Sequence, residues 1–188
     1  MMWVVIAIVV IIILLVIFAI VGFNKLRQKD IEAQEALGGI DVQLTRRADL
    51  IPNLVETVKG YASHEKGVFE AVTEARAGVQ KAAASGTVEE KAAAEAVLDK
   101  ALVNVMAVAE QYPDLKASTN FLQLQGQLTD TENQLAFARQ YYNDAVSTLN
   151  KLVVTIPWMF FAGMAGVAKR AFYQAPEGQT TPPAVSFS

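Results

Sequence analysis

The sequence has no cysteine and a single histidine, His64, and both shortages restrict the chemistry that the chain can carry. Without cysteine there is no disulfide, no thiolate nucleophile and no zinc–thiolate site. One histidine cannot supply the two Glu-x-x-His motifs of a di-metal bundle site. A Ser-His-Asp arrangement would depend on His64 alone, which lies at an expected helix start and is more typical of an exposed or capping residue. The sequence therefore predicts no enzyme, no metal and no cofactor.

Glycine-rich phosphate loops and basic patches are also missing. The glycines between residues 38 and 78 lie in or between expected helices, and none forms a phosphate-cradling motif. There are 16 Lys and Arg against 19 Asp and Glu, a net charge of −3, with no clustered basic surface. These features argue against nucleic acid and against a small-molecule substrate as partners.

What the sequence does have is a long apolar beginning, because residues 1–23 contain no charged side chain. Sixteen of the eighteen residues from Val4 to Val21 are Val, Ile, Leu or Phe. About 20 such residues in a helix span the roughly 30 Å hydrocarbon core of a bilayer. A cleaved signal peptide would instead have a basic start, a shorter apolar run and a small-residue cleavage site. We therefore expect an uncleaved transmembrane anchor at 1–23.

The flanks of this anchor predict its orientation. Lys25, Arg27 and Lys29 follow it at once, and basic residues favour the cytoplasmic side. We expect a single-pass protein with the N-terminus outside and residues 24–188 in the cytoplasm. The predicted anchor residues, with aromatic side chains near both interfaces, are Trp3, Ile12, Leu15, Phe18, Phe23, Lys25 and Arg27.

After the anchor, apolar residues recur at three- and four-residue spacing, which is typical of packed helices. The fold class is all-α: an N-terminal transmembrane helix continuous with a long antiparallel four-helix bundle of coiled-coil character. Pro52 should kink the first bundle helix near Ala48. Gly86 should end the second, and Thr87 with Glu90 predicts a capping box for the third. The bundle is expected over 24–156, with helices at about 24–61, 65–84, 88–111 and 117–156.

The helix lengths predict self-association. At 1.5 Å per residue the first and fourth helices are roughly 48 and 58 Å long, and the middle two roughly 30 and 36 Å. The short pair would leave apolar stripes uncovered near the membrane, and such stripes usually mark an interface. We expect a homo-oligomer, with the lipid bilayer as a second partner. The predicted contact residues are Ile31, Leu37, Ile40, Tyr142, Leu149 and Leu152.

The stretch 157–174 is too short for a second transmembrane helix, but it has aromatic residues at one end and basic residues at the other. It suits an amphipathic element lying on anionic lipid; a buried cap under the bundle is the alternative. The predicted membrane-surface residues are Trp158, Phe160, Phe161, Lys169 and Arg170. The Pro-rich tail 175–188 lacks a helical pattern, so disorder is expected there.

A polar face of the first bundle helix lies opposite its apolar seam, at Arg46, Asp49, Asn53 and Glu56. Simple solvation with pairing between neighbouring turns accounts for such a face. Contact with a partner helix or another subunit is the second interpretation.

Several separate motifs resemble the LemA family over about residues 1–175: IDVQL at 40–44, DLIPNLVETVKGY at 49–61, YPDLKA at 112–117 and YNDAV at 142–146. The resemblance implies an N-terminal membrane anchor and a helical-bundle cytoplasmic domain. It also implies a bacterial protein of the inner membrane, in a family with one branch associated with magnetosome membranes.

Two functions compete at this point. The first is a non-catalytic, self-assembling scaffold that organises or remodels the bacterial inner membrane. The second is a membrane-tethered adaptor that binds another membrane protein, such as a protease or a signalling complex, through the polar face at Arg46–Glu56.

Overall fold

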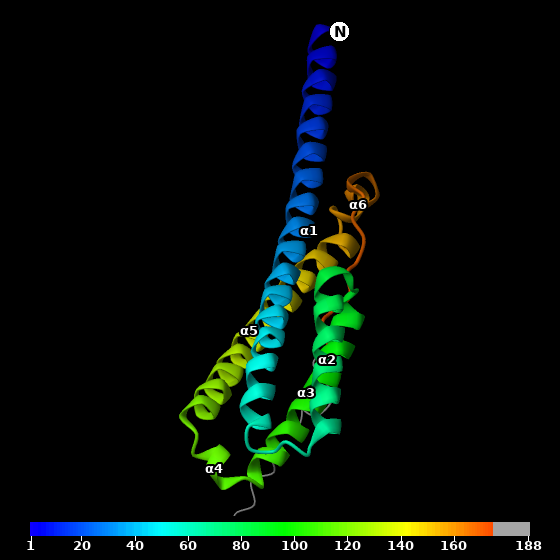
Figure 1. Cartoon of the computed structure of the whole chain (residues 1–188). Helices are drawn as coiled ribbons and strands as arrows, with labels where there is room; N and C mark the ends of the chain where they lie inside the picture. The colour runs from blue at the N-terminus through cyan, green and yellow to red at the C-terminus, as the bar shows by residue number, and fades with distance from the viewer. Residues whose placement is uncertain (175–188) are drawn as a thin grey trace, which may run out of the picture. The chain divides into compact units, whose positions relative to one another are not determined.

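A computed structural model describes residues 1–174, which form helices and no strand, so the all-α prediction is confirmed (Figure 1). The predicted tail at 175–188 lies outside the described residues. The ends of the bundle helices lie within about two residues of the predicted ends, apart from the first start, which is continuous with the apolar stretch. The helices are α1 Met2–Lys59, α2 Lys66–Ser85, α3 Val88–Glu110, α4 Pro113–Lys116, α5 Thr119–Val154 and α6 Met159–Ala165.

The described chain divides into two compact units, and α1 and α5 each contribute to both. Unit 1 comprises Met1–Ala36 and Tyr141–Phe172, and unit 2 comprises Leu37–Gln140 with residues 173–174. The division expected from sequence, an anchor at 1–23, a bundle at 24–156 and a membrane-proximal segment at 157–174, stays a prediction.

Unit 2 is a bundle built from the second half of α1, α2, α3 and the first part of α5, with α4 as a short turn. Because only residues 86 and 87 link α2 to α3, these helices pack as a hairpin. The predicted capping box is present: Glu90 N donates to Thr87 Oγ1 at 3.2 Å, and Thr87 N donates to Glu90 Oε2 at 2.7 Å. The larger buried apolar side chains are Ile40, Leu44, Ile51, Leu54, Val58, Phe69, Val72, Val79, Leu98, Leu102, Val105, Leu115, Phe121, Leu124, Leu128 and Leu135.

Pro52 lies inside α1, and the helix continues through it. A proline has no N–H, so the carbonyl of the residue four positions earlier, Ala48, loses its helical donor. Arg76 of α2 supplies a replacement, because its Nε donates to Ala48 O at 3.0 Å. The carbonyl that Pro52 leaves without a helical donor thus forms a hydrogen bond that joins α1 to α2.

In unit 1, the chain after α6 returns along the second part of α5. Asn150 and Arg170 exchange two hydrogen bonds, Asn150 Nδ2 to Arg170 O and Arg170 N to Asn150 Oδ1, both 2.9 Å. Tyr142 Oη donates to Ala171 O at 2.9 Å, and Arg170 Nε donates to Asp30 Oδ1 of α1 at 2.8 Å. This return segment, residues 167–172, covers α5 where no partner within the chain was expected.

The return segment corrects part of the predicted oligomer interface. Ile40, Tyr142 and Leu149 are buried within the single chain, so they do not form an uncovered stripe. For Tyr142 the length argument was wrong because it counted only α2 and α3 as possible cover, whereas Tyr142 Oη donates to Ala171 O of the return segment. Ile31 is exposed, and Leu37 and Leu152 are half-buried, and for these three the oligomer interface stays a prediction.

The Ala48–Arg76 bond gives a test of how α1 tolerates its proline. We expect Arg76→Met to lower the free energy of unfolding by about 1–3 kcal/mol, since a carbonyl loses a charged donor. In a Pro52→Ala background, which restores the N–H for Ala48, the same substitution should cost clearly less. Chemical unfolding of the detergent-solubilised protein, followed by circular dichroism, measures both. Equal losses in the two backgrounds would contradict this role for Arg76.

Candidate functional site

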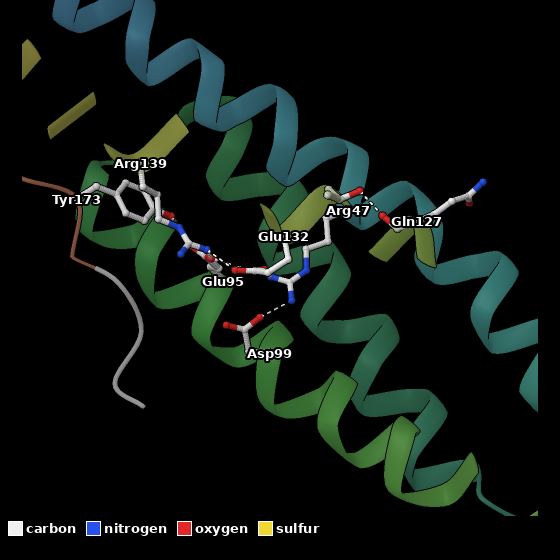
Figure 2. A network of polar contacts seen from close by, with 8 residues as sticks. Arg47, Glu95, Asp99, Gln127, Glu132, Arg139 and Tyr173 are labelled. Carbon is white, nitrogen blue, oxygen red and sulfur yellow. Dashed lines mark hydrogen bonds and ion pairs between the residues drawn. The ribbon is translucent and has the colours of Figure 1, made fainter. Parts of the chain in front are cut away.

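A network of ionisable side chains lies inside unit 2 and joins three helices to the end of the described chain (Figure 2). Glu95 is fully buried, and Arg47 and Arg139 are nearly so. Buried charges are rare unless they are paired, so this cluster is the most unusual feature of the core. Its members are Arg47 of α1, Glu95 and Asp99 of α3, Glu132 and Arg139 of α5, and Tyr173.

Glu132 connects the two arginines. Its Oε2 lies 2.9 Å from Arg47 Nη1, and its Oε1 lies 3.1 Å from Arg139 Nη2. Arg47 Nη2 also pairs with Asp99 Oδ1 at 2.6 Å, and Arg139 Nη2 pairs with Glu95. Each guanidinium therefore bridges α3 and α5, which fixes how these helices are aligned against each other and against α1.

Tyr173 completes the network from the end of the return segment. Its Oη donates to Glu95 Oε2 at 2.7 Å, and its side chain is buried. Because Glu95 accepts from Tyr173 on one oxygen and from Arg139 on the other, both of its oxygens are occupied. The contact attaches the chain to α3 just after the return segment.

A second buried pair lies elsewhere in unit 2. Lys91 Nζ of α3 lies 2.5 Å from Asp41 Oδ1 of α1 and donates to Ala83 O, near the end of α2, at 3.0 Å. Lys91 is buried, so this ammonium is satisfied by the protein and ties three helices together.

Burial dominates the electrostatics of the network, which holds two guanidiniums and three carboxylates. It raises the pKa of Glu95 above 4.5, and the Arg139 charge only partly offsets this. Burial also raises the pKa of Asp99 above 3.8, against the opposing Arg47 charge. The pKa of Tyr173 is raised by burial and by Glu95, so its hydroxyl keeps the proton that it donates.

The chemistry open to this network is structural. Arginine does not act as a base at ordinary pH, and the carboxylate oxygens already contact guanidinium or hydroxyl groups. Within residues 1–174, no group of His, Cys, Asp and Glu side chains is arranged to hold a metal ion. His64 is exposed in the link between α1 and α2.

A groove of about 1280 Å³ opens beside the network between α3 and α5. Leu102, Val103, Met106 and Leu128 line it, with Arg47, Asp99 and Glu132 also reaching it. These charged groups bind each other, and Lys100 also lines the groove, whose exposed wall is mainly apolar.

The sequence interpretation missed this network. It assigned Arg46 to the polar face and said nothing of the neighbouring Arg47, which is the buried one. One signal was available: Glu95 and Asp99 lie one turn apart in the helix expected at 88–111, and Glu95 lies three residues before the apolar Leu98, on the same side of that helix. An acidic residue on the apolar side of a helix predicts a buried basic partner, but the pattern does not identify which arginine that partner is.

The structure brings several predicted membrane residues together within unit 1. The ring centroids of Phe18 and Trp158 are 6.0 Å apart, and those of Phe18 and Phe161 are 5.4 Å apart. Lys25 Nζ lies 4.3 Å from the centroid of the Trp158 ring. A Cβ on Gly22 would lie 2.5 Å from the Phe161 ring, so glycine is required for this approach.

The other predicted site residues are spread out. Trp3, Ile12, Leu15, Phe23, Phe160 and Lys169 are exposed, while Arg170 pairs with Asp30. Arg27 Nη1 lies 3.8 Å from Asp30 Oδ2. On the polar face, Arg46, Asp49, Asn53 and Glu56 are all exposed, and Arg46 Nη1 donates to Gln134 Oε1 at 2.9 Å.

Together these features define a helical-bundle protein whose N-terminal helix is long and apolar enough to cross a membrane. The sequence model of the LemA family matches residues 36–187. The chain belongs to the LemA family, as the sequence motifs predicted.

Curated relatives include proteins with two kinds of name. The chain is 24% identical to magnetosome protein MamQ of Magnetospirillum gryphiswaldense, over 79% of this chain and 64% of that protein. It is 25% identical to magnetosome protein MamQ 2 of Paramagnetospirillum magneticum, over 85% and 67% of the two chains. It is also 25% identical to protein LemA of Metamycoplasma hominis, over 82% and 69%. The chain thus spans about two thirds of the length of these relatives, and their names are not those of enzymes.

The network predicts a large penalty for leaving a buried carboxylate without its partner. We expect Arg139→Met to lower the free energy of unfolding by about 3–5 kcal/mol, because Glu95 stays buried and loses its countercharge. Adding Glu95→Gln should recover part of this loss. Denaturant unfolding measures both variants, with the exposed Arg46→Met as a control that should cost under about 1 kcal/mol. A loss in Arg139→Met as small as the control's would contradict the role of the network.

The raised pKa values predict how stability depends on pH. A carboxyl whose pKa is higher in the folded state binds its proton more tightly there, so its stabilising contribution is complete below the ordinary value and is lost as pH rises through the raised one. For Glu95 the loss begins above about pH 4.5. Glu95→Gln should therefore flatten the fall in melting temperature with rising pH, whereas the exposed Glu89→Gln should not. Identical pH slopes for wild type and Glu95→Gln would be the opposing result.

Proposed function

We propose that this protein is a non-catalytic, membrane-tethered helical scaffold that self-associates and organises or remodels the bacterial inner membrane. The observation that carries the proposal is α1. None of the residues in its apolar N-terminal window is buried within the described residues, and the same unbroken helix continues into the packed core. An uncovered apolar helix of this length needs lipid around it, whereas the continuation needs the rest of the bundle.

The orientation rests on the charges that follow the apolar stretch. Lys25, Arg27 and Lys29 support a cytoplasmic location for the bundle and an outside N-terminus. Asp30 and Glu32 lie close by, and both pair with these basic residues. Acidic residues have little influence on orientation, so they leave this assignment unchanged.

Self-association is supported by apolar side chains that remain exposed. Ile31 is 47% exposed in unit 1, and Leu37 and Leu152 are half-buried. In unit 2, Phe137 is exposed. Tethering confines the copies to a plane at high effective concentration, so weak lateral contacts become sufficient for assembly.

The relatives support a role in membrane organisation. Two of them are named magnetosome proteins, and the chain aligns with about two thirds of their length. From these relatives we transfer to this chain only an association with a membrane, and no activity.

The adaptor is the second candidate, and one observation favours it. Arg46, Asp49, Asn53 and Glu56 all lie exposed on one face of α1, so that face is free to bind another membrane protein. Arg46 donates a hydrogen bond to Gln134, and this bond lies at the surface.

Site-specific photo-crosslinking in native membranes separates the two candidates. A photoreactive amino acid at Ile31 should give a ladder of self-multiples if the protein is a scaffold, because Ile31 is exposed in the tethered unit. The same amino acid at Asp49 serves as the matched position on the polar face. A dominant heterologous band from Asp49, with no self-multiples from Ile31, would favour the adaptor and contradict the scaffold.

A further inference from the structure

The chain between α5 and the return segment is an apolar hairpin. Residues 156–168 contain no charged side chain, whereas Lys151 precedes them and Lys169 and Arg170 follow. α5 and α6 meet at a bend of 107°. Seven helical residues extend only about 10 Å, against roughly 30 Å for the hydrocarbon core. The hairpin therefore cannot cross a bilayer and must return to the side from which it came.

Contacts with α1 set the level of this hairpin within unit 1. At its base, Trp158 lies against Lys25, and Arg170 pairs with Asp30. Further along, Phe161 packs against Phe18 and closely against Gly22. Phe18 lies seven residues before Lys25, which is about 10 Å along a helix. The hairpin thus lies beside the apolar stretch of α1, while its charged flanks lie beside the first charged residues after that stretch.

We propose that residues 156–168 form a re-entrant hairpin that inserts into one leaflet of the bilayer, beside α1, with lipid acyl chains as its occupant. This deepens the proposed function and rests on the membrane tether. It differs from a helix lying on the headgroups, because the hairpin sits level with residues that are themselves inside the apolar span.

The backbone of the hairpin meets the main requirement for entering lipid, which is that its polar groups bind one another. Met159 N donates to Thr155 O at 2.9 Å, and Phe161 N donates to Trp158 O at 2.9 Å. At the turn, Gly166 adopts a φ of 64°, which favours glycine, and Val167 N donates to Ala162 O at 3.0 Å. Pro157 brings no N–H that would need a partner.

The outward side of the hairpin carries large apolar side chains that no part of residues 1–174 covers. Phe160 is 67% exposed and Met164 is 66% exposed, with Ile156 and Met159 exposed as well. Continuity with the uncovered apolar stretch of α1 points to the same occupant for both, which is lipid. A hairpin that fills one leaflet and not the other expands that leaflet, which would give a scaffold a direct means to bend the membrane.

The absence of cysteine allows a direct test in the full chain. A single cysteine at Met164 would carry a fluorophore, with the protein reconstituted in vesicles of phosphatidylcholine and phosphatidylglycerol. Val103→Cys on α3 is the matched aqueous control, since Val103 is also 66% exposed. Ile12→Cys reports the middle of the apolar stretch. We expect the Met164 label to be several-fold less accessible to iodide than the Val103 label, and to be quenched by shallow lipid-attached quenchers.

Three results would overturn the proposal. An iodide accessibility equal to that of Val103 would place the hairpin in water. Protection from both iodide and lipid quenchers would place protein, such as a second copy, over this face. An iodide-accessible label at Ile12 would contradict both the membrane tether and the inserted hairpin. A protected label at Ile12 together with an iodide-accessible label at Met164 would contradict the hairpin alone and leave the proposed function standing.

A second variant tests the docking against α1. Gly22→Val places side-chain atoms where the Phe161 ring lies, so it should displace the hairpin and raise the iodide accessibility of the Met164 label. Ala7→Val, on an exposed part of the same helix, should leave that accessibility unchanged. Equal accessibility in the two variants would contradict the packing of Phe161 on Gly22 as the element that holds the hairpin.

Discussion

A single helix, α1, has to satisfy two environments along its length, and the other elements depend on how it does so. From its start to about Lys25 most of its apolar side chains are exposed among residues 1–174, and from Leu26 onward it buries an apolar face. A helix can pass from one environment to the other without a break, because its backbone hydrogen bonds are internal in both. The bundle therefore needs no linker to the apolar stretch, and unit 1 gathers the segments that pack beside the transition.

The buried charged residues of unit 2 have a different role from its buried apolar residues. The inward faces of α2 and α3 bury mainly Val, Leu and Ala, and apolar contacts alone leave the relative sliding of helices weakly determined. The ion pairs of Arg47 with Asp99 and of Arg139 with Glu95 exist in a single alignment of α1, α3 and α5. Buried ion pairs add little net stability but penalise misalignment heavily, which suits them to fixing register.

The return segment is short and irregular, but it covers α5 and leads into the buried network. Residues 167–172 cover α5 through backbone groups, and Tyr173 then joins the buried network at Glu95. Apolar residues that looked free for a partner, such as Leu149, are covered by the chain itself. The exposed apolar surface that remains in unit 1 is concentrated instead on the apolar stretch and on the hairpin after Ile156, and both are suited to lipid.

Local physics made the sequence informative about the helices and their ends. Three- and four-residue periodicity, the Thr87–Glu90 capping box and the stop at Gly86 act within one or two turns, and the structure contains them. At Pro52 the same local rules identified the carbonyl that loses its donor, but the group that satisfies Ala48 comes from a different helix.

By itself, therefore, the sequence determined an all-α chain of the LemA family with an apolar first helix, since composition and periodicity depend only on near neighbours. Only the tertiary structure decided which charges are buried together and which apolar residues are covered. Arg76 meets Ala48 across 28 positions, and Arg170 meets Asp30 across 140. Contacts at such separations follow from how the helices are connected and packed, and no local pattern of residues encodes them.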